Sequence, residues 1–342
     1  MRIHPPTSGA TPSPGPSCPA RRGACPARRV RAGRAPVAYH AAVPDIDGSL
    51  AAGQVWRGQG DWSQAARRAK RRITTGRRAV AALTAAAAVA GTAAARLAAS
   101  APTAGRVLAL VAAVSLLLVP VLGRRASRDA VAVWTRLRAV SEASKAELYR
   151  YLARVAPYAG ADADAVLLHR YGLLVDGVGD LVGHTLDGTP ADRPLPPVTG
   201  LPSYLAERVQ RQVDGYYLPA ARQAARAATR IGRAATALTV VAAVLSAVVG
   251  VFGDALGLTA WVPVVAAVTT ALVGYGAAER HEQQHLEYAR TADQLTRLRL
   301  TRAAGLGWTD DEAFVAEAER IIAQSNAAWM AKMIEDDGAA QQ

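Results

Sequence analysis

The residues best suited to chemistry form the pentapeptide HEQQH, from His281 to His285. This spacing places His281 and His285 on one face of a helix, where they can bind Zn²⁺ while Glu282 acts as a general base. However, Gln283 is polar, the surrounding ERHEQQHLEY is charged, and no third metal ligand can be assigned. The sequence therefore favours a solvated helix face here. An HExxH-type membrane metalloprotease stays a minor alternative, and we predict no enzyme, no metal and no cofactor.

A second group of polar and aromatic residues lies in helices that follow long apolar stretches. Charged residues three or four positions apart on a helix contribute a few tenths of a kcal/mol each when they only support that helix. The alternative is that they join neighbouring subunits below the membrane, with aromatic residues packing between helices. The predicted subunit contacts are Arg138, Glu142, Arg290, Asp293 and Trp329.

Four apolar stretches must position these residues. They are Ala79–Ala95, Val107–Gly123, Ala234–Gly253 and Ala255–Ala278. A helix needs roughly 20 apolar residues to cross a hydrocarbon core of about 30 Å, which the last two stretches satisfy and the first two approach. The chain is 51% hydrophobic but only 5% aromatic, which fits long alanine-rich helices. We predict an all-α integral membrane protein with two tandem transmembrane hairpins, about four transmembrane helices, and long cytoplasmic flanking helices. For the first hairpin, a soluble helical pair is the alternative.

The predicted spans contain no central acidic or basic residue, which disfavours a transporter or a proton relay. If a pore exists, hydroxyl side chains and backbone must line it. Buried contacts between helices are the alternative role for the same positions. The candidates for pore lining or packing are Thr239, Ser246, Thr269 and Thr270.

The net charge of +13 is concentrated near the N-terminus. Residues 1–78 hold 15 Lys/Arg and 3 Asp/Glu, whereas residues 79–342 hold 25 and 24. A basic tail with a membrane-flanking cluster is not the spread basic face of a nucleic-acid-binding domain. Arginines flank the open ends of both hairpins, where the chain enters and leaves them, while the tight loops between paired spans carry few charges. By the positive-inside rule, both termini are cytoplasmic, and the protein is a multi-pass protein of the inner (plasma) membrane.

The domain organisation follows from composition. Residues 1–55 are rich in Pro, Gly, Arg and Ala, contain the isolated Cys18 and Cys25, and are predicted to be disordered without a metal site or disulfide framework. The predicted units are a first hairpin unit at 56–158, a cytoplasmic connector and linker at 159–202, a second hairpin unit at 203–333, and a disordered tail at 334–342.

The two hairpin units look like copies of one another. Each has a basic entry helix, an arginine-flanked hairpin and a polar exit helix. Gly76 matches Gly232, and Trp134, Arg138 and Glu142 match Tyr288, Arg290 and Asp293.

The second unit resembles the SLATT family, the two-transmembrane domains associated with SMODS and SLOG proteins, also met as DUF4231. The resemblance lies in the layout of several elements: the entry helix with Tyr204, Arg208, Gln212, Tyr216 and Ala220, the tight hairpin, the exit YARTADQL, and the last helix with Glu319, Asn326 and Trp329. The first unit resembles a diverged copy, so the likeness covers roughly residues 56–333.

The resemblance implies a membrane effector of a prokaryotic conflict or anti-phage system that oligomerises and perturbs or permeabilises the inner membrane. It also implies a nucleotide-producing or nucleotide-sensing partner protein. The expected partners are therefore lipid, further copies of the chain and such a protein, and not nucleic acid. The alternative is a non-conducting membrane scaffold or sensor that recruits a cytoplasmic partner through residues 141–205.

Overall fold

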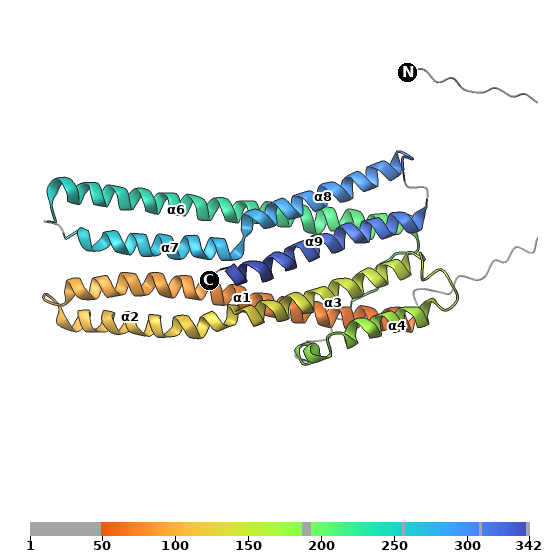
Figure 1. Cartoon of the computed structure of the whole chain (residues 1–342), viewed down its shortest axis with the longest axis horizontal. Helices are drawn as coiled ribbons and strands as arrows, with labels where there is room; N and C mark the ends of the chain where they lie inside the picture. Colours follow the sequence, from red (N-terminus) through yellow and green to blue (C-terminus); the bar gives the residue numbers. More distant parts are fainter. Residues whose placement is uncertain (1–48, 187–192, 255–256, 308–309, 340–342) are drawn as a thin grey trace, which may run out of the picture. The chain divides into compact units, whose positions relative to one another are not determined.

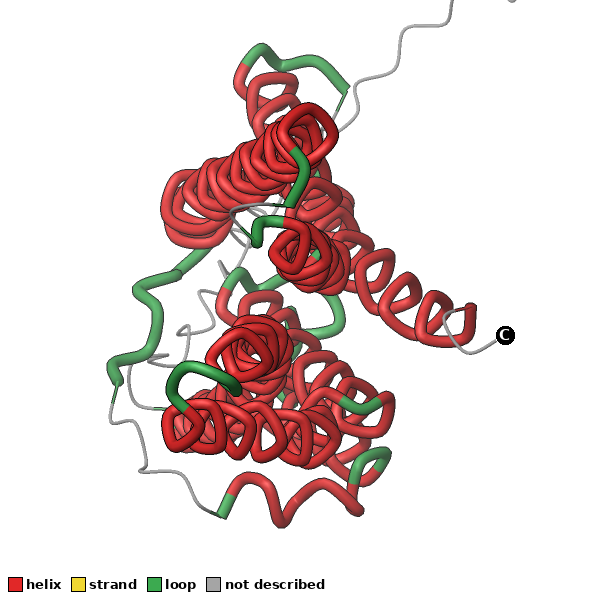
Figure 2. Tube along the Cα trace, turned by 90° about the vertical axis from the view of Figure 1, so that its left-hand side faces the viewer, coloured by secondary structure: helices red, strands yellow, loops and turns green. Residues whose placement is uncertain are grey.

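The computed structural model describes residues 49–186, 193–254, 257–307 and 310–339, with side chains described up to Asn326. All regular elements in these ranges are helices, and none is a strand (Figure 2). The predicted all-α fold is therefore confirmed. The predicted disorder of the N-terminus, with Cys18 and Cys25, falls on residues 1–48, outside the described ranges.

The first unit consists of a long helical hairpin and the helices that follow it. Its elements are α1 (Leu50–Leu97), α2 (Pro102–Gly123), the short 3₁₀ turn η2 (Arg124–Ala126), α3 (Arg128–Leu152), α4 (Ala163–Asp176) and η3 (Gly179–Thr185). Ser49 caps α1 and Ser127 caps α3, because each hydroxyl accepts a hydrogen bond from the backbone N–H three residues on. Pro102 begins α2 at a position where a missing N–H costs no hydrogen bond.

The second unit repeats this order. Its elements are α5 (Leu201–Tyr204), the π-helical segments η4 (Leu205–Gln210) and η5 (Val213–Tyr217), α6 (Leu218–Phe252), η6 (Thr259–Trp261), α7 (Val262–Glu279), α8 (His281–Ala303) and α9 (Asp311–Ala339). Arg280 adopts a left-handed conformation with φ of 51° and separates α7 from α8. The second hairpin therefore bends where it leaves its apolar stretch.

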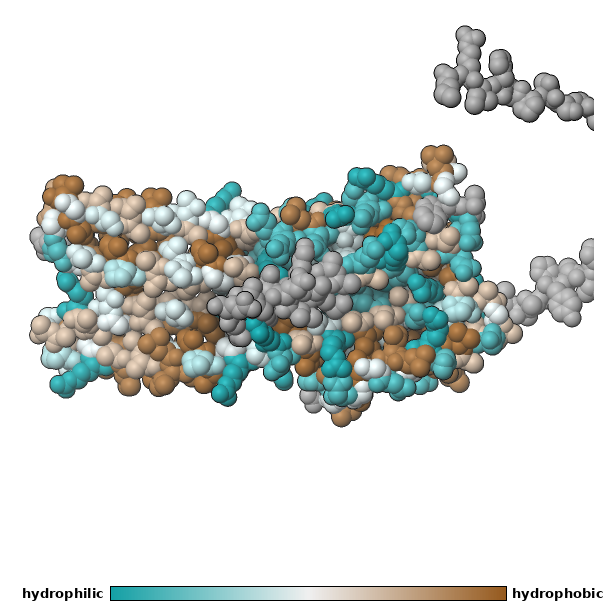
Figure 3. Space-filling model, viewed as in Figure 1, coloured by the Kyte–Doolittle hydropathy of each residue, from teal (hydrophilic) through white to brown (hydrophobic). Residues whose placement is uncertain are grey.

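The hairpin ends of both units form an apolar region, which we call the membrane half (residues 79–123, 234–254 and 257–278). Within the described ranges, four helices are long and apolar enough to cross a membrane. In their most apolar windows, between none and 17% of the residues are buried within the chain. Leu117, Val251 and Phe252 are among the large side chains that face outward. Figure 3 shows this half almost free of hydrophilic colour except at its edges. Water cannot favourably cover such extended apolar faces, and the chain is a multi-pass membrane protein whose spans face the apolar interior of the membrane.

The helical segments outside the membrane half form a second region, which we call the polar bundle. It comprises the first part of α1, α3, α4, η3, the segments from α5 to the start of α6, α8 and α9, and it has its own hydrophobic core. Leu148, Tyr204, Leu295 and Phe314 are fully buried there, together with residues from α1 and from the connector. A smaller cluster around Trp62, Trp134 and Leu137 joins α1 to α3 and η3 nearer the membrane half. Side chains from both units therefore share one core, and α9 lies against α3 (Figure 1).

The predicted boundaries differ from the observed helix ends by a few residues. Helix α1 begins at Leu50, within the segment assigned to the disordered N-terminus, and the predicted tail begins inside α9. The connector packs on the bundle instead of extending freely. Trp56 Nε1 donates a hydrogen bond of 2.9 Å to the carbonyl of Pro194, and the Arg193 guanidinium lies 3.3 Å from the centre of the Trp56 ring.

The first hairpin depends on a close approach at Gly76. A Cβ at this position would lie 2.9 Å from Cβ of Arg125 and 3.1 Å from the carbonyl oxygen of Leu122. Its predicted counterpart Gly232 has no such neighbour, since a Cβ there would meet nothing within 4 Å. In the second hairpin the tight contact lies instead at Gly276, where a Cβ would come within 2.9 Å of Ile231. The two hairpins therefore share their layout but not their packing.

We predict that Gly76→Leu lowers the free energy of unfolding by about 1–3 kcal/mol, because the side chain must push two backbone segments apart. Gly232→Leu is the matched control, since it makes the same change in helix propensity at an open position. Thermal unfolding of the detergent-solubilised variants measures both effects. Equal melting temperatures for the two variants would contradict the close approach.

Candidate functional site

The centre of the polar bundle is a buried ion pair between Arg208 and Glu319. Arg208 donates two hydrogen bonds, from Nε to Oε1 at 2.8 Å and from Nη2 to Oε2 at 2.7 Å. Both side chains are only 1% exposed. The Tyr204 hydroxyl also donates to Oε1 of Glu319 at 2.9 Å, and the Arg208 guanidinium lies 4.8 Å from the centre of the Tyr149 ring. This carboxylate therefore joins α9 to the start of the entry helix, beside α3.

The two π-helical segments set the direction of these side chains. Arg208 lies in η4, and Tyr216 and Tyr217 lie in η5. A π-helical turn widens the helix and shifts the side chains that follow it to another face, and such turns are frequent at functional sites. Two residues nine positions apart lie on opposite faces of a regular α-helix, which has about 3.6 residues per turn. Arg208 and Tyr217 are nevertheless both buried in the bundle.

A second polar contact joins the two units one level nearer the membrane half. Nη2 of Arg138 on α3 donates to the Tyr216 hydroxyl at 3.0 Å and to Oδ1 of Asn326 on α9 at 3.1 Å. Tyr288 packs edge-on against Tyr216, with ring centres 5.8 Å apart. Arg138 therefore joins α3, the second entry helix (α5, η4, η5 and the start of α6) and α9 within one chain.

A small cavity of about 170 Å³ lies between these two contacts. Arg208, Glu319, Glu142 and Asn326 line it together with alanine and isoleucine side chains of α3 and α9. Oε2 of Glu142 and Nη1 of Arg208 are buried and have no hydrogen-bond partner among the described residues. Buried polar atoms of this kind are normally satisfied by water, and the cavity is large enough to hold it.

Lys145 adds a third positive charge to this cluster. Burial and the positive charge of Arg208 lower the pKa of Lys145 to about 8, although the negative charges of Glu142 and Glu319 oppose the shift. The pKa of Glu142 is lowered despite its burial, because Lys145, Arg138 and Arg208 favour its charged form. The cluster therefore contains three cations and two carboxylates, all held by α3, η4 and α9.

The two hairpins meet at the boundary between the membrane half and the polar bundle. Nη1 of Arg77 on α1 donates to the carbonyl of Ala278 at 2.7 Å and lies 3.8 Å from Oε1 of Glu279. Nε of Arg78 donates to the Tyr275 hydroxyl at 3.1 Å. Because the last carbonyls of a helix lack partners and carry a partial negative charge, Arg77 caps the end of α7.

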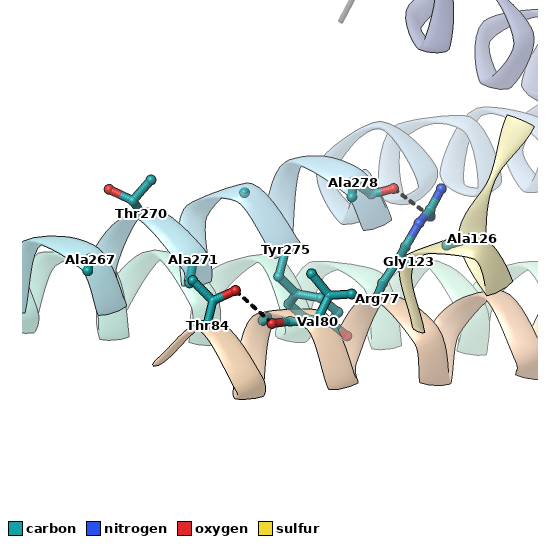
Figure 4. Close-up of a pocket in the computed structure, with 12 residues that line it drawn as sticks. Arg77, Val80, Thr84, Gly123, Ala126, Ala267, Thr270, Ala271, Tyr275 and Ala278 are labelled. Atoms are coloured by element: carbon teal, nitrogen blue, oxygen red, sulfur yellow. Dashed lines mark hydrogen bonds between the residues drawn. The ribbon is translucent and has the colours of Figure 1, made fainter. Parts of the chain in front are cut away.

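A groove runs from this contact into the membrane half between α1 and α7. Its volume is about 640 Å³, and small side chains form most of its walls. Figure 4 shows Val80 and Thr84 of α1 beside Ala271 and Tyr275 of α7, with Arg77 at one end. Small residues allow helices to approach closely in a membrane, and here they leave space between two hairpins that are joined at the boundary.

The hydroxyl residues predicted to line a pore or to pack lie on the membrane half but make only local hydrogen bonds. Thr239, Ser246, Thr269 and Thr270 each donate to the carbonyl four residues earlier, at 2.7–3.0 Å. Thr239, Ser246 and Thr270 are exposed in the single chain, and Thr270 lines the groove. Whether they line a pore or pack against another helix stays a prediction.

The HEQQH segment lies in the first turns of α8, directly after the break at Arg280. Nδ1 of His285 contacts the carbonyl of Ala221 on α6 at 3.1 Å, and Glu282 is exposed. No group of three metal-ligating side chains occurs in the described part of the chain. In this structure His285 therefore has a packing contact, and no third ligand stands beside the pair.

The residues predicted to contact another subunit fall into two groups. Arg138 and Glu142 lie inside the bundle, where Arg138 joins the two units of one chain, a role the sequence had not specified. Arg290 and Asp293 lie on the exposed face of α8, where Asp293 pairs with Arg297 at 2.8 Å. Trp329 belongs to α9, but its side chain lies outside the described residues. Contact with a second subunit stays a prediction for all five.

Sequence reasoning had noted Arg208 and Glu319 separately but had not paired them. The two residues are 111 positions apart, and the π-helical turns make helical spacing a poor guide to which face Arg208 occupies. The roles of Arg77 and Lys145 were also missed. The signal available for Lys145 was its rarity, since lysine occurs at only three positions in a chain rich in arginine.

The fold and this site define a class of protein: an all-α multi-pass membrane protein with two hairpins and one shared polar bundle. Comparison with known families gives two matches. Residues 204–329 match the family described as SMODS and SLOG-associating 2TM effector domain 1, and residues 61–165 match the protein family of unknown function DUF4231. The resemblance inferred from the sequence is thus confirmed, and the matches are consistent with two tandem SLATT-type domains. No curated protein and no solved structure matches the chain.

We predict that Glu319→Gln lowers the free energy of unfolding by about 3–5 kcal/mol, because it leaves the buried Arg208 cation without its counter-charge. Glu317→Gln is the control on the same helix. It removes a carboxylate that pairs with Arg320 on the surface, where solvent screens the pair. Chemical denaturation followed by tryptophan fluorescence compares the two variants. A wild-type midpoint for Glu319→Gln would show that the pair does not hold the bundle together.

A second prediction concerns pH. In the unfolded chain the pKa of Lys145 returns to its ordinary value of 10.5, whereas in the folded chain it is about 8. Between these values the unfolded chain binds more protons, so the free energy of unfolding rises with pH, by on the order of 3 kcal/mol in total. Lys145→Met removes this contribution, and denaturation midpoints from pH 7.5 to 10.5 should then rise less than those of the wild type. Parallel pH profiles for the two proteins would contradict the burial of a charged lysine.

Proposed function

We propose that this protein is a membrane effector that oligomerises and perturbs or permeabilises the inner membrane of a prokaryotic cell, in a conflict or anti-phage system. It acts by assembly and not by catalysis. The family description as a 2TM effector domain supports the class of function. The single structural observation that carries the proposal is the contrast between a well-packed polar bundle and a membrane half that is scarcely buried within one chain.

The membrane half has the surface that lateral assembly requires. Helices associate in lipid through small residues and close packing, since apolar surface alone does not favour protein over lipid tails. The alanine, glycine and threonine side chains of α1 and α7 supply such surfaces beside the groove. Exposed hydroxyls at Thr239, Ser246 and Thr270 would then face other copies of the chain.

The polar bundle supplies a means of control. The same long helices run through both halves, so a change in the packing of α3, α9 and the second entry helix moves the attached spans. Arg77 and Arg78 couple the first hairpin to the end of α7. A signal that binds one arrangement of the bundle more tightly shifts the population of hairpin arrangements, and an oligomer that opens a conducting path is one such arrangement.

The arginine distribution supports cytoplasmic termini and a cytoplasmic polar bundle. The signal would then arrive from a cytoplasmic partner, and a nucleotide-producing or nucleotide-sensing protein is the partner class that the family resemblance suggests. Nucleic acid is not expected, because the positive charge beyond residue 78 is balanced by acidic residues.

A non-conducting scaffold or sensor is the second candidate, and one observation favours it. Within the segment proposed to recruit a partner, residues 141–205, several large apolar side chains of α4, η3 and the turn after it are exposed. They are Leu168, Leu173, Val182 and Leu186. Exposed apolar groups gathered on adjoining elements indicate a protein contact. Dye release from liposomes separates the two functions, since a scaffold releases nothing even with its trigger present.

We predict that induced expression depolarises the host membrane. Replacing Thr269 and Thr270 with leucine should reduce this effect, because the groove loses the Thr270 hydroxyl and free volume, and α7 loses the neighbouring hydroxyl of Thr269. Thr229→Leu is the control. Thr229 makes the same local hydrogen bond on α6, at 2.9 Å to the carbonyl four residues earlier, but precedes the apolar span. Membrane potential is read with a voltage-sensitive dye at matched, verified expression. An unchanged potential in cells that contain abundant protein and its trigger would contradict the pore.

A further inference from the structure

A cavity outside the site described above opens at the base of the first hairpin. It lies between α1, α3 and η3 and has a volume of about 340 Å³. Arg68 and Arg72 of α1 and Arg125 of η2 line it, with Asp129 and His184 as further polar residues. Ala65, Ala69, Ala130 and Val133 form its apolar floor. The formal charge of the lining is therefore positive.

Two of these arginines are not neutralised by the protein. The side chains of Arg72 and Arg125 are exposed and have no ion pair or hydrogen bond within the described ranges. Some surface arginines of the bundle do have a carboxylate partner, such as Arg136 with Asp180 at 2.7 Å. Arg68 is held in place, because its Nη2 donates to the carbonyl of His184 at 2.8 Å. The cavity thus gathers unpaired cations from two separate elements over an apolar floor.

The cavity lies close to the ends of the first two membrane spans, at the level of the lipid headgroups. Arg125 follows the end of the second span by two residues, and Arg72 precedes the first span by seven, which is about 10 Å along a helix. The headgroup layer extends roughly 5–8 Å beyond the hydrocarbon core on each side. With the length of an arginine side chain, both guanidinium groups reach this layer.

We propose that this cavity binds the phosphate of an anionic phospholipid headgroup. The guanidinium groups of Arg72 and Arg125 hold the phosphate oxygens, since arginine matches phosphate geometry with paired hydrogen bonds. Asp129 and the imidazole of His184 face the hydroxyl groups of a glycerol headgroup. The alanine and valine floor contacts its carbon atoms. Basic pockets beside transmembrane helices are known to bind such headgroups.

The bound lipid has a structural consequence. Its phosphate would join η2 at the end of the second span to α1 before the first span, next to the close contact at Gly76. Anionic lipid would then stabilise the base of the first hairpin. This role does not depend on whether the protein conducts.

The test uses purified full-length protein in detergent, titrated with phosphatidylglycerol or with phosphatidylcholine while its melting temperature is recorded. We expect phosphatidylglycerol to raise the melting temperature more than phosphatidylcholine does. The double variant R72Q/R125Q should weaken the apparent affinity for phosphatidylglycerol about thirtyfold, from two lost arginine contacts. The control R71Q/R124Q removes the same charge from adjacent positions that do not line the cavity, and it should keep most of the effect.

Three results would overturn the assignment. If both double variants lose affinity equally, the lipid effect is general surface electrostatics. If glycerol phosphate or inorganic phosphate at millimolar concentration gives the full stabilisation, the site takes a soluble phosphate and not a lipid. If R72Q/R125Q keeps the wild-type affinity, the cavity is not the site. Equal melting temperatures of all proteins without lipid show that the substitutions leave the fold intact.

Discussion

The helices of this protein pass from lipid into water, and the interactions that stabilise them differ on the two sides of that boundary. In the membrane half, apolar side chains can face lipid, so the four spans need little internal packing. In the polar bundle, the same helices must bury a core and satisfy every polar group away from water. Arg77 and Arg78 lie at the boundary between the membrane half and the polar bundle. They contact the end of α7, whose unpaired carbonyls cannot remain unsatisfied near lipid.

Within the bundle, specificity comes from charge and not from hydrophobic surface alone. An apolar core accepts several arrangements of amphipathic helices. A fully buried Arg208 accepts only the arrangement that brings Glu319 to it, because an unpaired charge there is strongly unfavourable. Together with Arg138, Tyr216 and Asn326, this pair fixes α9 against both units. The last helix of the second unit thus unites two copies that share little detailed packing.

The two copies differ in where their hairpins pack most closely. At Gly76 the first hairpin packs tightly on its own exit, whereas the counterpart Gly232 is open and Gly276 provides the close approach instead. The two copies have therefore diverged in packing while they keep the same order of elements.

The sequence by itself determined the helical class, the four spans and the tandem organisation, because apolar length, arginine placement and repeated layout are properties of continuous segments. It also marked Arg138, Arg208 and Glu319 as residues of interest. Only the tertiary structure decided which of them meet, since Arg208 and Glu319 are 111 positions apart and two π-helical segments shift the faces of the entry helix. The same holds for the cavity at Arg72 and Arg125, whose members come from separate helices. Local patterns predict elements, whereas contacts between distant elements depend on how those elements pack.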